Sequence, residues 1–181
     1  VILKARQLGI STLTAAYSLW LMTFRNDKNI LVLATKQDTA KNLVTKIRVM
    51  HSNLPNWLRQ KCIEDNKLSL RYKNGSQVKA VSSSEDSGRS EALSLLVLDE
   101  AAFIDKIDTI WAAAQQTLST GGQCIALSTP NGVGNWFHRT WVDAEEGVNG
   151  FHPIKLHWTV HPERDEVYRK EQDKLLGPGL A

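Results

Sequence analysis

The first residues that suggest chemistry form the segment Lys4–Thr12 (KARQLGIST), which combines basic side chains, one glycine and adjacent hydroxyls. A standard phosphate-binding loop has the pattern G-x-x-x-x-G-K-[ST]. Relative to it, Ser11 stands at the magnesium-binding hydroxyl, Lys4 stands at the first glycine, and Ile10 replaces the usual lysine. A loop curled around an anion offers main-chain N–H groups and a helix N-terminus, and Lys4 could supply the missing charge. The segment predicts phosphate binding, with a plain turn before a helix as the alternative.

Two further apolar runs end in groups that complement a phosphate loop. Asp99 and Glu100 follow the run Leu95–Leu98, and such a pair can hold Mg²⁺ through water and deprotonate an attacking water molecule. Ser128 and Thr129 follow another apolar run, and their hydroxyls can contact a γ-phosphate and sense its loss. The alternatives are a carboxylate that caps the next helix and a plain strand-to-loop turn. The order of the three features indicates a P-loop ATPase with an additional catalytic glutamate.

Hydrophobic periodicity predicts the elements that position these residues. Short apolar runs predict buried strands of a parallel sheet over 30–34, 93–98 and 124–127, and further strands are expected over 1–3 and near 151–156. Helical spacing of apolar residues predicts helices near 13–24, 40–50, 107–118, 135–145 and 163–175. The expected packing face of the first helix consists of Leu13, Ala16, Tyr17, Trp20, Leu21 and Phe24. Chemistry in such a sheet is expected at the carboxyl ends of its strands.

One segment changes from this pattern to strict alternation. Residues 68–72 and 77–81 alternate polar and apolar side chains around Asn74 and Gly75, which predicts an antiparallel hairpin. The polar run 82–91 is expected to form a loop. Strands that alternate with helices predict an α/β fold, here a P-loop NTPase of the RecA-like (ASCE) kind. Its mostly parallel sheet would be flanked by helices and carry the inserted β-hairpin.

Length and composition limit the possible classes of protein. The chain has 181 residues, of which 42% are hydrophobic and 23% charged, which suits one globular domain and excludes wholesale disorder. The net charge of +3 permits a nucleic-acid partner without establishing one. Cys62 and Cys124 form neither a zinc pattern nor a disulfide framework, so a reducing compartment is expected. No membrane association is expected, and the opening apolar run without methionine suggests a fragment of a longer protein.

Several segments together resemble the large terminase subunit of tailed bacteriophages, the motor that pumps DNA into procapsids. The matching segments are Arg6–Gly9, 95–104 (LLVLDEAAFI), 128–132 (STPNG) and 161–165 (HPERD). The first is similar to the family's phosphate loop, the second to its second nucleotide motif and the third to its coupling motif. Several members of the family carry a lysine at the start of the loop, where Lys4 lies. The resemblance covers nearly the whole chain, and Ile10 is its departure.

By position, the resemblance implies a set of residues that bind ATP and Mg²⁺. Lys4 would contact the β- and γ-phosphates. Ser11 would ligate Mg²⁺, and Asp99 would hold the ion from the second shell of ligands. The other residues implied to bind ATP are Gln7, Gly9, Ser11 and Thr12.

The resemblance also implies which residues carry out and transmit hydrolysis. Glu100 would activate the attacking water, and Arg6 would sense or stabilise the γ-phosphate. Ser128 and Thr129 would couple hydrolysis to movement. Arg89 is a weaker arginine candidate, with a solvated surface role as its alternative.

Partners and location follow from the same resemblance. The expected partners are double-stranded DNA, the portal protein and the small terminase subunit, in a homo-oligomeric ring on the procapsid in the cytoplasm of the bacterial host. Residues 1–181 would be a partial terminase ATPase domain, without the family's upstream adenine-binding segment and downstream nuclease domain. No nuclease activity is expected, because the carboxylates after Asn131 lack the strand-borne cluster of a two-metal site. A helicase-like DNA translocase and a catalytically silent P-loop-like assembly module, motivated by Ile10, remain alternatives.

Overall fold

The computed structural model describes residues 1–82, 92–119 and 121–176. Its strands are β1 (Ile2–Lys4), β2 (Asn29–Ala34), β3 (Cys62–Asp65), β4 (Ser69–Tyr72), β5 (Gln77–Ser82), β6 (Leu95–Asp99), β7 (Gln123–Ser128) and β8 (Ile154–Leu156). Its helices are α1 (Ile10–Phe24), α2 (Gln37–Ser52), α3 (Ile107–Leu118), α4 (Trp136–Glu145) and α5 (Glu166–Leu176). Two short 3₁₀ turns are η2 (Ala101–Phe103) and η3 (Trp158–Val160).

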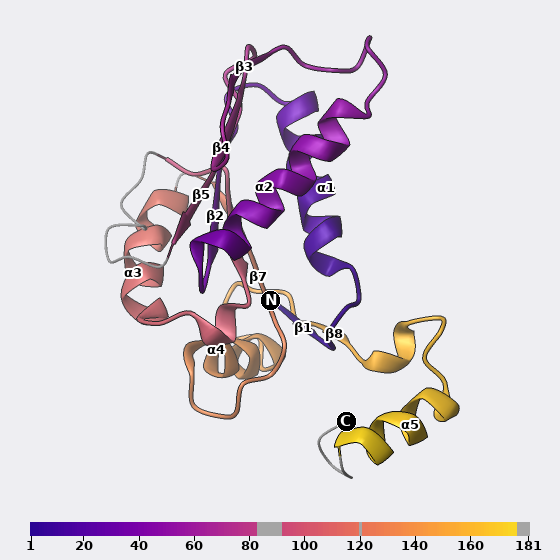
Figure 1. Cartoon of the computed structure of the whole chain (residues 1–181). Helices are drawn as coiled ribbons and strands as arrows, with labels where there is room; N and C mark the ends of the chain where they lie inside the picture. Colours follow the sequence, from indigo (N-terminus) through magenta and orange to yellow (C-terminus); the bar gives the residue numbers. More distant parts are fainter. Residues whose placement is uncertain (83–91, 120, 177–181) are drawn as a thin grey trace.

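Within the described residues, one sheet with strand order β3-β4-β5-β2-β6-β7-β1-β8 forms the centre of the molecule (Figure 1). Neighbouring strands from β5 to β8 are parallel, whereas β3 and β4 extend the sheet in antiparallel pairing. Strand β7 lies between β1 and β6. Because parallel strands end at the same edge, the ends of β1, β7 and β6 are neighbours there. This topology brings the three chemically suggestive segments together.

Helices cover both faces of the sheet (Figure 1). On β6, Leu95 and Val97 belong to the core beneath α1 and α2, whereas Leu96 and Leu98 belong to the core beneath α3 and α4. The central strands are therefore buried on both faces, which explains their continuous apolar runs. The α/β fold class predicted from the sequence is confirmed.

The packing face predicted for α1 is wrong. Leu13, Trp20 and Phe24 are 65%, 45% and 55% exposed, although Leu21 of the predicted face is buried. The rings of Tyr17 and Trp20 stack with centroids 5.8 Å apart, and the ring of Phe24 lies 6.2 Å from that of Trp20. The face that packs on the sheet consists instead of Thr14, Ala15, Ser18, Leu19 and Met22.

Two hydroxyls on the buried face of α1 explain why this face differs from the predicted one. The Thr14 hydroxyl donates to the carbonyl oxygen of Ile10 at 2.9 Å, and the Ser18 hydroxyl donates to that of Thr14 at 2.9 Å. A short side chain that bonds to the preceding helical turn can be buried without an unpaired polar atom. The hydrophobic pattern counted these residues as polar and therefore selected the wrong face.

The remaining predicted elements are confirmed, with shifts of a few residues at their ends. Strands β4 and β5 pair as the predicted hairpin through Leu70 and Val78, and Gly75 in its turn has a φ of 83°. Strand β3 was not predicted, because Cys62–Asp65 does not alternate between polar and apolar residues and lies mostly exposed beside β4. Of the predicted loop 82–91, Ser82 ends β5, and residues 83–91 lie outside the described part of the chain.

The C-terminal part of the chain returns to the first strand. Strand β8 pairs with β1 in parallel, with Ile2 opposite Ile154, and η3 and α5 follow as an arm beside this edge of the sheet (Figure 1). No helix in the described ranges combines the length and the apolar character needed to cross a membrane.

Candidate functional site

The loop between β1 and α1 has main-chain geometry suited to an anion. Gln7 and Gly9 both adopt the left-handed conformation, with φ of 59° and 75°. Such residues gather successive N–H groups into a concave anion site. In the described part of the chain, the N–H groups of residues 6–11 donate no hydrogen bond to another main-chain atom, whereas those of Thr12 and Leu13 donate to the Gly9 carbonyl oxygen. The loop and the first turn of α1 therefore leave donors available for phosphate.

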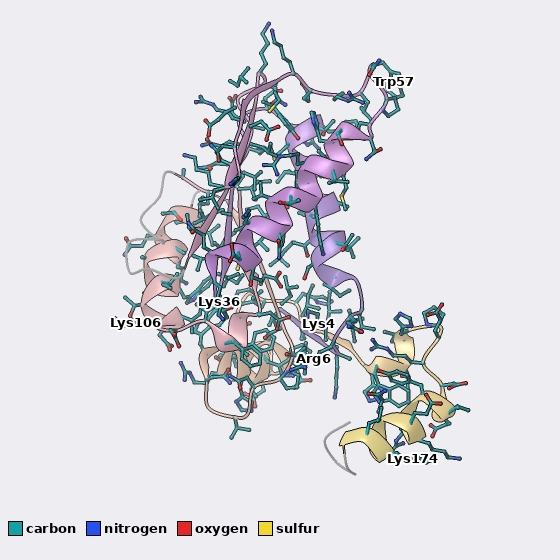
Figure 2. The ribbon with its side chains drawn as sticks, viewed as in Figure 1. Lys4, Arg6, Lys36, Trp57, Lys106 and Lys174 are labelled. Atoms are coloured by element: carbon teal, nitrogen blue, oxygen red, sulfur yellow. The ribbon has the colours of Figure 1, made fainter. Side chains whose placement is uncertain are left out.

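Lys4, the last residue of β1, directs its ammonium group at the carboxylate of Glu100. The Lys4 Nζ lies 2.9 Å from Glu100 Oε1, and the Lys4 side chain is 7% exposed. Figure 2 shows Lys4 at the end of β1, close to Arg6. A lysine thus lies beside the loop although Ile10 occupies the usual lysine position. Because little water surrounds the ammonium group, its electrostatic effect is stronger than that of a surface lysine.

Glu100 follows β6 in an uncommon main-chain conformation, with φ of 55° and ψ of 47°. The left-handed region costs a non-glycine residue about 1–2 kcal/mol, a strain that is typical of functional sites. Its Oε2 accepts hydrogen bonds from the Thr129 N–H at 3.3 Å and from the Thr129 hydroxyl at 3.4 Å. The Glu100 side chain makes no capping hydrogen bond to η2, so the structure does not support the helix-capping alternative for this residue.

Asp99 ends β6 beside the first turn of α1. The Ser11 hydroxyl donates to Asp99 Oδ1 at 3.2 Å, and Asp99 is 5% exposed. Burial, and then the neighbouring Glu100 carboxylate, raise the pKa of Asp99, while the Lys4 ammonium and the Ser11 hydroxyl act in the opposite direction. Hydroxyl and carboxylate oxygens are the protein ligands that Mg²⁺ prefers. The Ser11 and Asp99 pair therefore fits a magnesium ion on the donor chemistry present.

Hydrogen bonds connect the end of β7 to η2, the turn that follows Glu100. The Ala102 N–H donates to Ser128 Oγ at 3.1 Å, and the Asn131 side-chain amide donates to the Ala102 carbonyl oxygen at 2.9 Å. Asn135 in turn donates to the Asn131 carbonyl oxygen at 2.8 Å and caps α4 by accepting from the His138 N–H. Hydrogen bonds therefore connect η2, the end of β7 and α4.

A cleft of about 660 Å³ opens at these strand ends. Its lining residues are Lys4, Arg6, Gln7, Thr35, Lys36, Glu100, Phe103, Asp105 and Thr129. A larger cavity of about 980 Å³ lies among α3, α4 and the beginning of β7, and the rings of Trp111, Trp136 and Phe151 line part of it. Because the smaller cleft holds the converging charges and adjoins the free N–H groups, it is the candidate site.

The sequence interpretation missed Thr35 and Lys36 in this cleft. They follow the apolar run of β2 just as Asp99 follows that of β6, so the same signal, a polar residue after a buried strand, could have identified them. Figure 2 shows Lys36 near this edge of the sheet. Arg164, which contacts the loop from the C-terminal arm, was also missed as a site residue.

The other candidate residues have diverse surroundings. The exposed Arg6 side chain lines the cleft, and the Gln7 Oε1 lies 3.5 Å from a guanidinium nitrogen of Arg164. The exposed Thr12 hydroxyl accepts a hydrogen bond from Lys46 Nζ at 2.9 Å. Arg89 lies outside the described residues.

The position of β7 between β1 and β6, with a glutamate after β6, defines a RecA-like (ASCE) α/β domain. The chain belongs to the family described as terminase large subunit, T4likevirus-type, N-terminal, whose model matches residues 1–173. The family resemblance inferred from the sequence is therefore confirmed.

Solved terminase structures share this fold. The large terminase ATPase domain of Thermus phage P74-26 is 25% identical, with a TM-score of 0.74 over 99% of this chain and 83% of that chain. The large terminase of another thermophilic bacteriophage, in complex with ATP-gamma-S, is 16% identical, with a TM-score of 0.66 over 94% of this chain and 42% of that chain. The HK97 bacteriophage large terminase is 19% identical, with a TM-score of 0.67 over 95% of this chain and 38% of that chain. This chain thus spans less than half of the last two proteins.

Proposed function

We propose that this chain hydrolyses ATP and that hydrolysis drives double-stranded DNA into a procapsid, as part of a large terminase subunit. The observation that carries the proposal is the convergence of Lys4, Asp99, Glu100 and Thr129 at one sheet edge. This convergence lies beside a loop whose N–H groups are free to bind phosphate. A cation, two carboxylates and an anion-binding loop are the groups that phosphoryl transfer to water requires.

In this proposal the loop and its lysine bind the phosphates of ATP. The N–H groups of residues 6–11 would surround the phosphate oxygens, helped by the N-terminal dipole of α1. Lys4 would contact the β- and γ-phosphates from the start of the loop, and Arg6 would reach the γ-phosphate from the cleft wall. The remaining proposed contacts to ATP are Gln7, Gly9, Ser11 and Thr12.

Glu100 is the proposed general base. It would orient a water molecule and accept its proton while the water oxygen bonds to the γ-phosphorus and the bond to ADP breaks. Both carboxylate oxygens are occupied in this structure, one by Lys4 and the other by Thr129. Because a γ-phosphate competes for the Lys4 ammonium, ATP binding would release Glu100 Oε1 for the water. Binding of ATP would thus free the general base that acts on it.

The Ser11 and Asp99 pair would hold the Mg²⁺ that accompanies ATP. The ion would neutralise charge on the phosphate oxygens. Ser11 would provide a direct ligand, while the Asp99 carboxylate would act through water. The Ser11 hydroxyl donates to Asp99 Oδ1 at 3.2 Å, so the two proposed residues already lie side by side.

Coupling to DNA would run through the end of β7. Ser128 and Asn131 both bond to Ala102, which lies just beyond Glu100, so a displacement of Glu100 would reach α4. The proposed partners are double-stranded DNA, the portal protein, the small terminase subunit and further copies in a ring, at the portal in the host cytoplasm. Residues 1–181 would form part of the ATPase domain, and adenine binding and nuclease activity would belong to other parts of the full-length protein.

The test is ATP hydrolysis by the full-length protein, with and without double-stranded DNA, for wild type, Lys4→Ala and Glu100→Gln. Both variants should lower turnover by about a hundredfold or more, because each loses a group that acts on the transition state. Glu100→Gln should retain ATP binding, since Glu100 acts on water. Arg48→Ala and Asp65→Asn are matched controls, because they disrupt an ion pair that lies outside both the cleft and the proposed coupling path.

The results of these hydrolysis assays distinguish the proposed mechanism from its alternatives. Normal turnover by Lys4→Ala would contradict the proposed role of Lys4 and direct attention to Arg6. ATP binding by wild type without magnesium-dependent hydrolysis would favour the silent assembly module instead. Normal turnover by Glu100→Gln would remove the general base from the proposal.

A further inference from the structure

The C-terminal arm contacts the phosphate loop through one arginine. Arg164 Nη1 donates to the Arg6 carbonyl oxygen at 2.8 Å, and Nη2 lies 3.5 Å from Gln7 Oε1. The Arg164 guanidinium also lies over the ring of Tyr168 in α5, 5.3 Å from its centroid. A single side chain therefore joins α5 to the loop that begins the nucleotide site.

The loop has few other restraints. Its first residue, Ala5, donates from its N–H to the Leu156 carbonyl oxygen at 2.9 Å. In the described ranges, residues 6–8 make no further main-chain hydrogen bond to another main-chain atom. Gln7 also holds a left-handed conformation that is unfavourable for a residue with a Cβ. A contact from outside the loop must therefore help to maintain its bend.

Arg164 meets this need without entering the cleft. It binds the Arg6 carbonyl oxygen, an acceptor that would repel phosphate oxygens, with a charge-assisted hydrogen bond. Its positive charge beside the loop also favours an anion there. Arg164 is absent from the cleft lining, which includes Lys4, Arg6 and Glu100, so it acts on the loop rather than on reacting atoms.

We propose that Arg164 is a positioning residue of the nucleotide site, which holds the phosphate loop in its anion-binding bend and links that bend to the placement of α5. This proposal rests on the proposed function for the identity of the ligand, ATP. The stacking of the guanidinium on Tyr168 fixes its position, so a displacement of α5 would withdraw the hydrogen bond from Arg6. Loop shape and the position of the C-terminal arm would therefore change together.

The test uses the full-length protein as wild type, Arg164→Ala, Arg164→Lys and Tyr168→Leu. The matched control is Arg169→Ala, because Arg169 lies on α5 next to Tyr168 and pairs with Asp173. Three quantities are measured: hydrogen exchange of the Ala5 amide, which donates to the Leu156 carbonyl oxygen, in the absence of nucleotide; ATP affinity; and kcat with KM. The first of these does not depend on ATP.

Arg164→Ala should speed exchange of the Ala5 amide, because a loosened loop opens its hydrogen bond to Leu156 more often. It should weaken ATP binding about tenfold, the effect of losing one hydrogen bond from a charged donor. KM should rise more than kcat falls, because loop shape rather than the reacting groups is altered. Arg164→Lys and Tyr168→Leu should give intermediate effects, and added methylguanidinium should partly restore Arg164→Ala. Arg169→Ala should match wild type.

Unchanged exchange of the Ala5 amide and unchanged ATP affinity in Arg164→Ala would overturn the proposal. Equal effects in Arg169→Ala would also overturn it, because they would show a general loosening of α5. If wild type fails to bind ATP, the proposed function fails, and the exchange measurement still decides the role of Arg164.

Discussion

Lys4 and Glu100 neutralise each other at the carboxyl edge of the sheet. An isolated ammonium as buried as that of Lys4, 7% exposed, would be costly, and the Glu100 carboxylate at 2.9 Å offsets that cost. Such a pair contributes little net stability but fixes the position of both groups. Groups fixed before substrate arrives need less reorganisation during the reaction. The pair therefore prepares the geometry on which the proposed chemistry depends.

Tyr72 in β4 gives a prediction at the scale of one residue. Its ring is buried and stacks on His51, and within the described ranges its hydroxyl has no hydrogen-bond partner. Burial, followed by the nearby Cys62 and Asp65, raises the pKa of Tyr72 above its usual 10, although Arg48 opposes this. The folded protein therefore keeps a proton that the unfolded chain releases above pH 10. Its free energy of unfolding should fall as the pH rises beyond 10.

Tyr72→Phe should reduce this alkaline loss of stability, and part of the remainder comes from Cys124, whose pKa burial raises to about 12. At pH 7 the free energy of unfolding of Tyr72→Phe should equal that of wild type or exceed it by about 1 kcal/mol, because an unpaired buried hydroxyl is lost. Urea denaturation between pH 7 and 11 measures both effects. Tyr17→Phe is the control, because the Tyr17 hydroxyl donates to Gln123 at 2.7 Å. An equal alkaline decline in wild type and Tyr72→Phe would contradict the prediction.

The sequence selected candidate site residues by their position after apolar runs, and their roles stay predictions. Lys4, Asp99 and Glu100 stand after apolar runs, and a local pattern is enough to find them. Their contacts were not predictable, because these depend on the insertion of β7 between β1 and β6. The contact of Arg164 with the loop depends similarly on the pairing of β8 with β1.

At the scale of elements, α1 shows where hydrophobic patterning fails. Periodicity correctly gave its existence, but the buried face contains the hydroxyls of Thr14 and Ser18, which bond within the helix. The hairpin was easier to predict, because alternation and the Asn74 and Gly75 turn act locally. Strand β3 has no such signal. It forms because its main chain pairs with the edge of β4, and its side chains are mostly exposed.

The losses of stability caused by substitutions on α1 should therefore rank in the opposite order to the one that the hydrophobic pattern predicts. Trp20→Ala should lower the free energy of unfolding by less than about 1 kcal/mol, because it removes a half-exposed ring whose ring contacts are with Tyr17 and Phe24 on the same helix. Met22→Ala should lower it by about 2–5 kcal/mol, because Met22 is fully buried under the sheet. Chemical denaturation measures both. A larger loss of stability for Trp20→Ala than for Met22→Ala would contradict this prediction and support the packing face inferred from the sequence.

At the scale of the whole molecule, two cores share one set of strands. Alternate residues of β2 and β6 belong to opposite cores. Unfolding of either helix layer would therefore expose apolar side chains of the sheet. Ile47→Ala in α2 and Ile110→Ala in α3 should each lower the free energy of unfolding by about 2–5 kcal/mol. Each variant should still unfold in one transition with coincident fluorescence and circular dichroism curves. Separate transitions for the two layers would contradict this prediction.

The location of β1 has a consequence for how the chain is made. Ile2 pairs with Leu127 on one side and with Ile154 on the other, so β1 is held by two strands that follow it by more than 120 residues along the chain. Contacts this distant along the chain form slowly and after local ones. During synthesis, the hairpin and the layer of α1 and α2 can assemble on β2 while β1 still lacks neighbours. The phosphate loop is synthesised before β7 and β8, yet it acquires its shape only after both strands have been made.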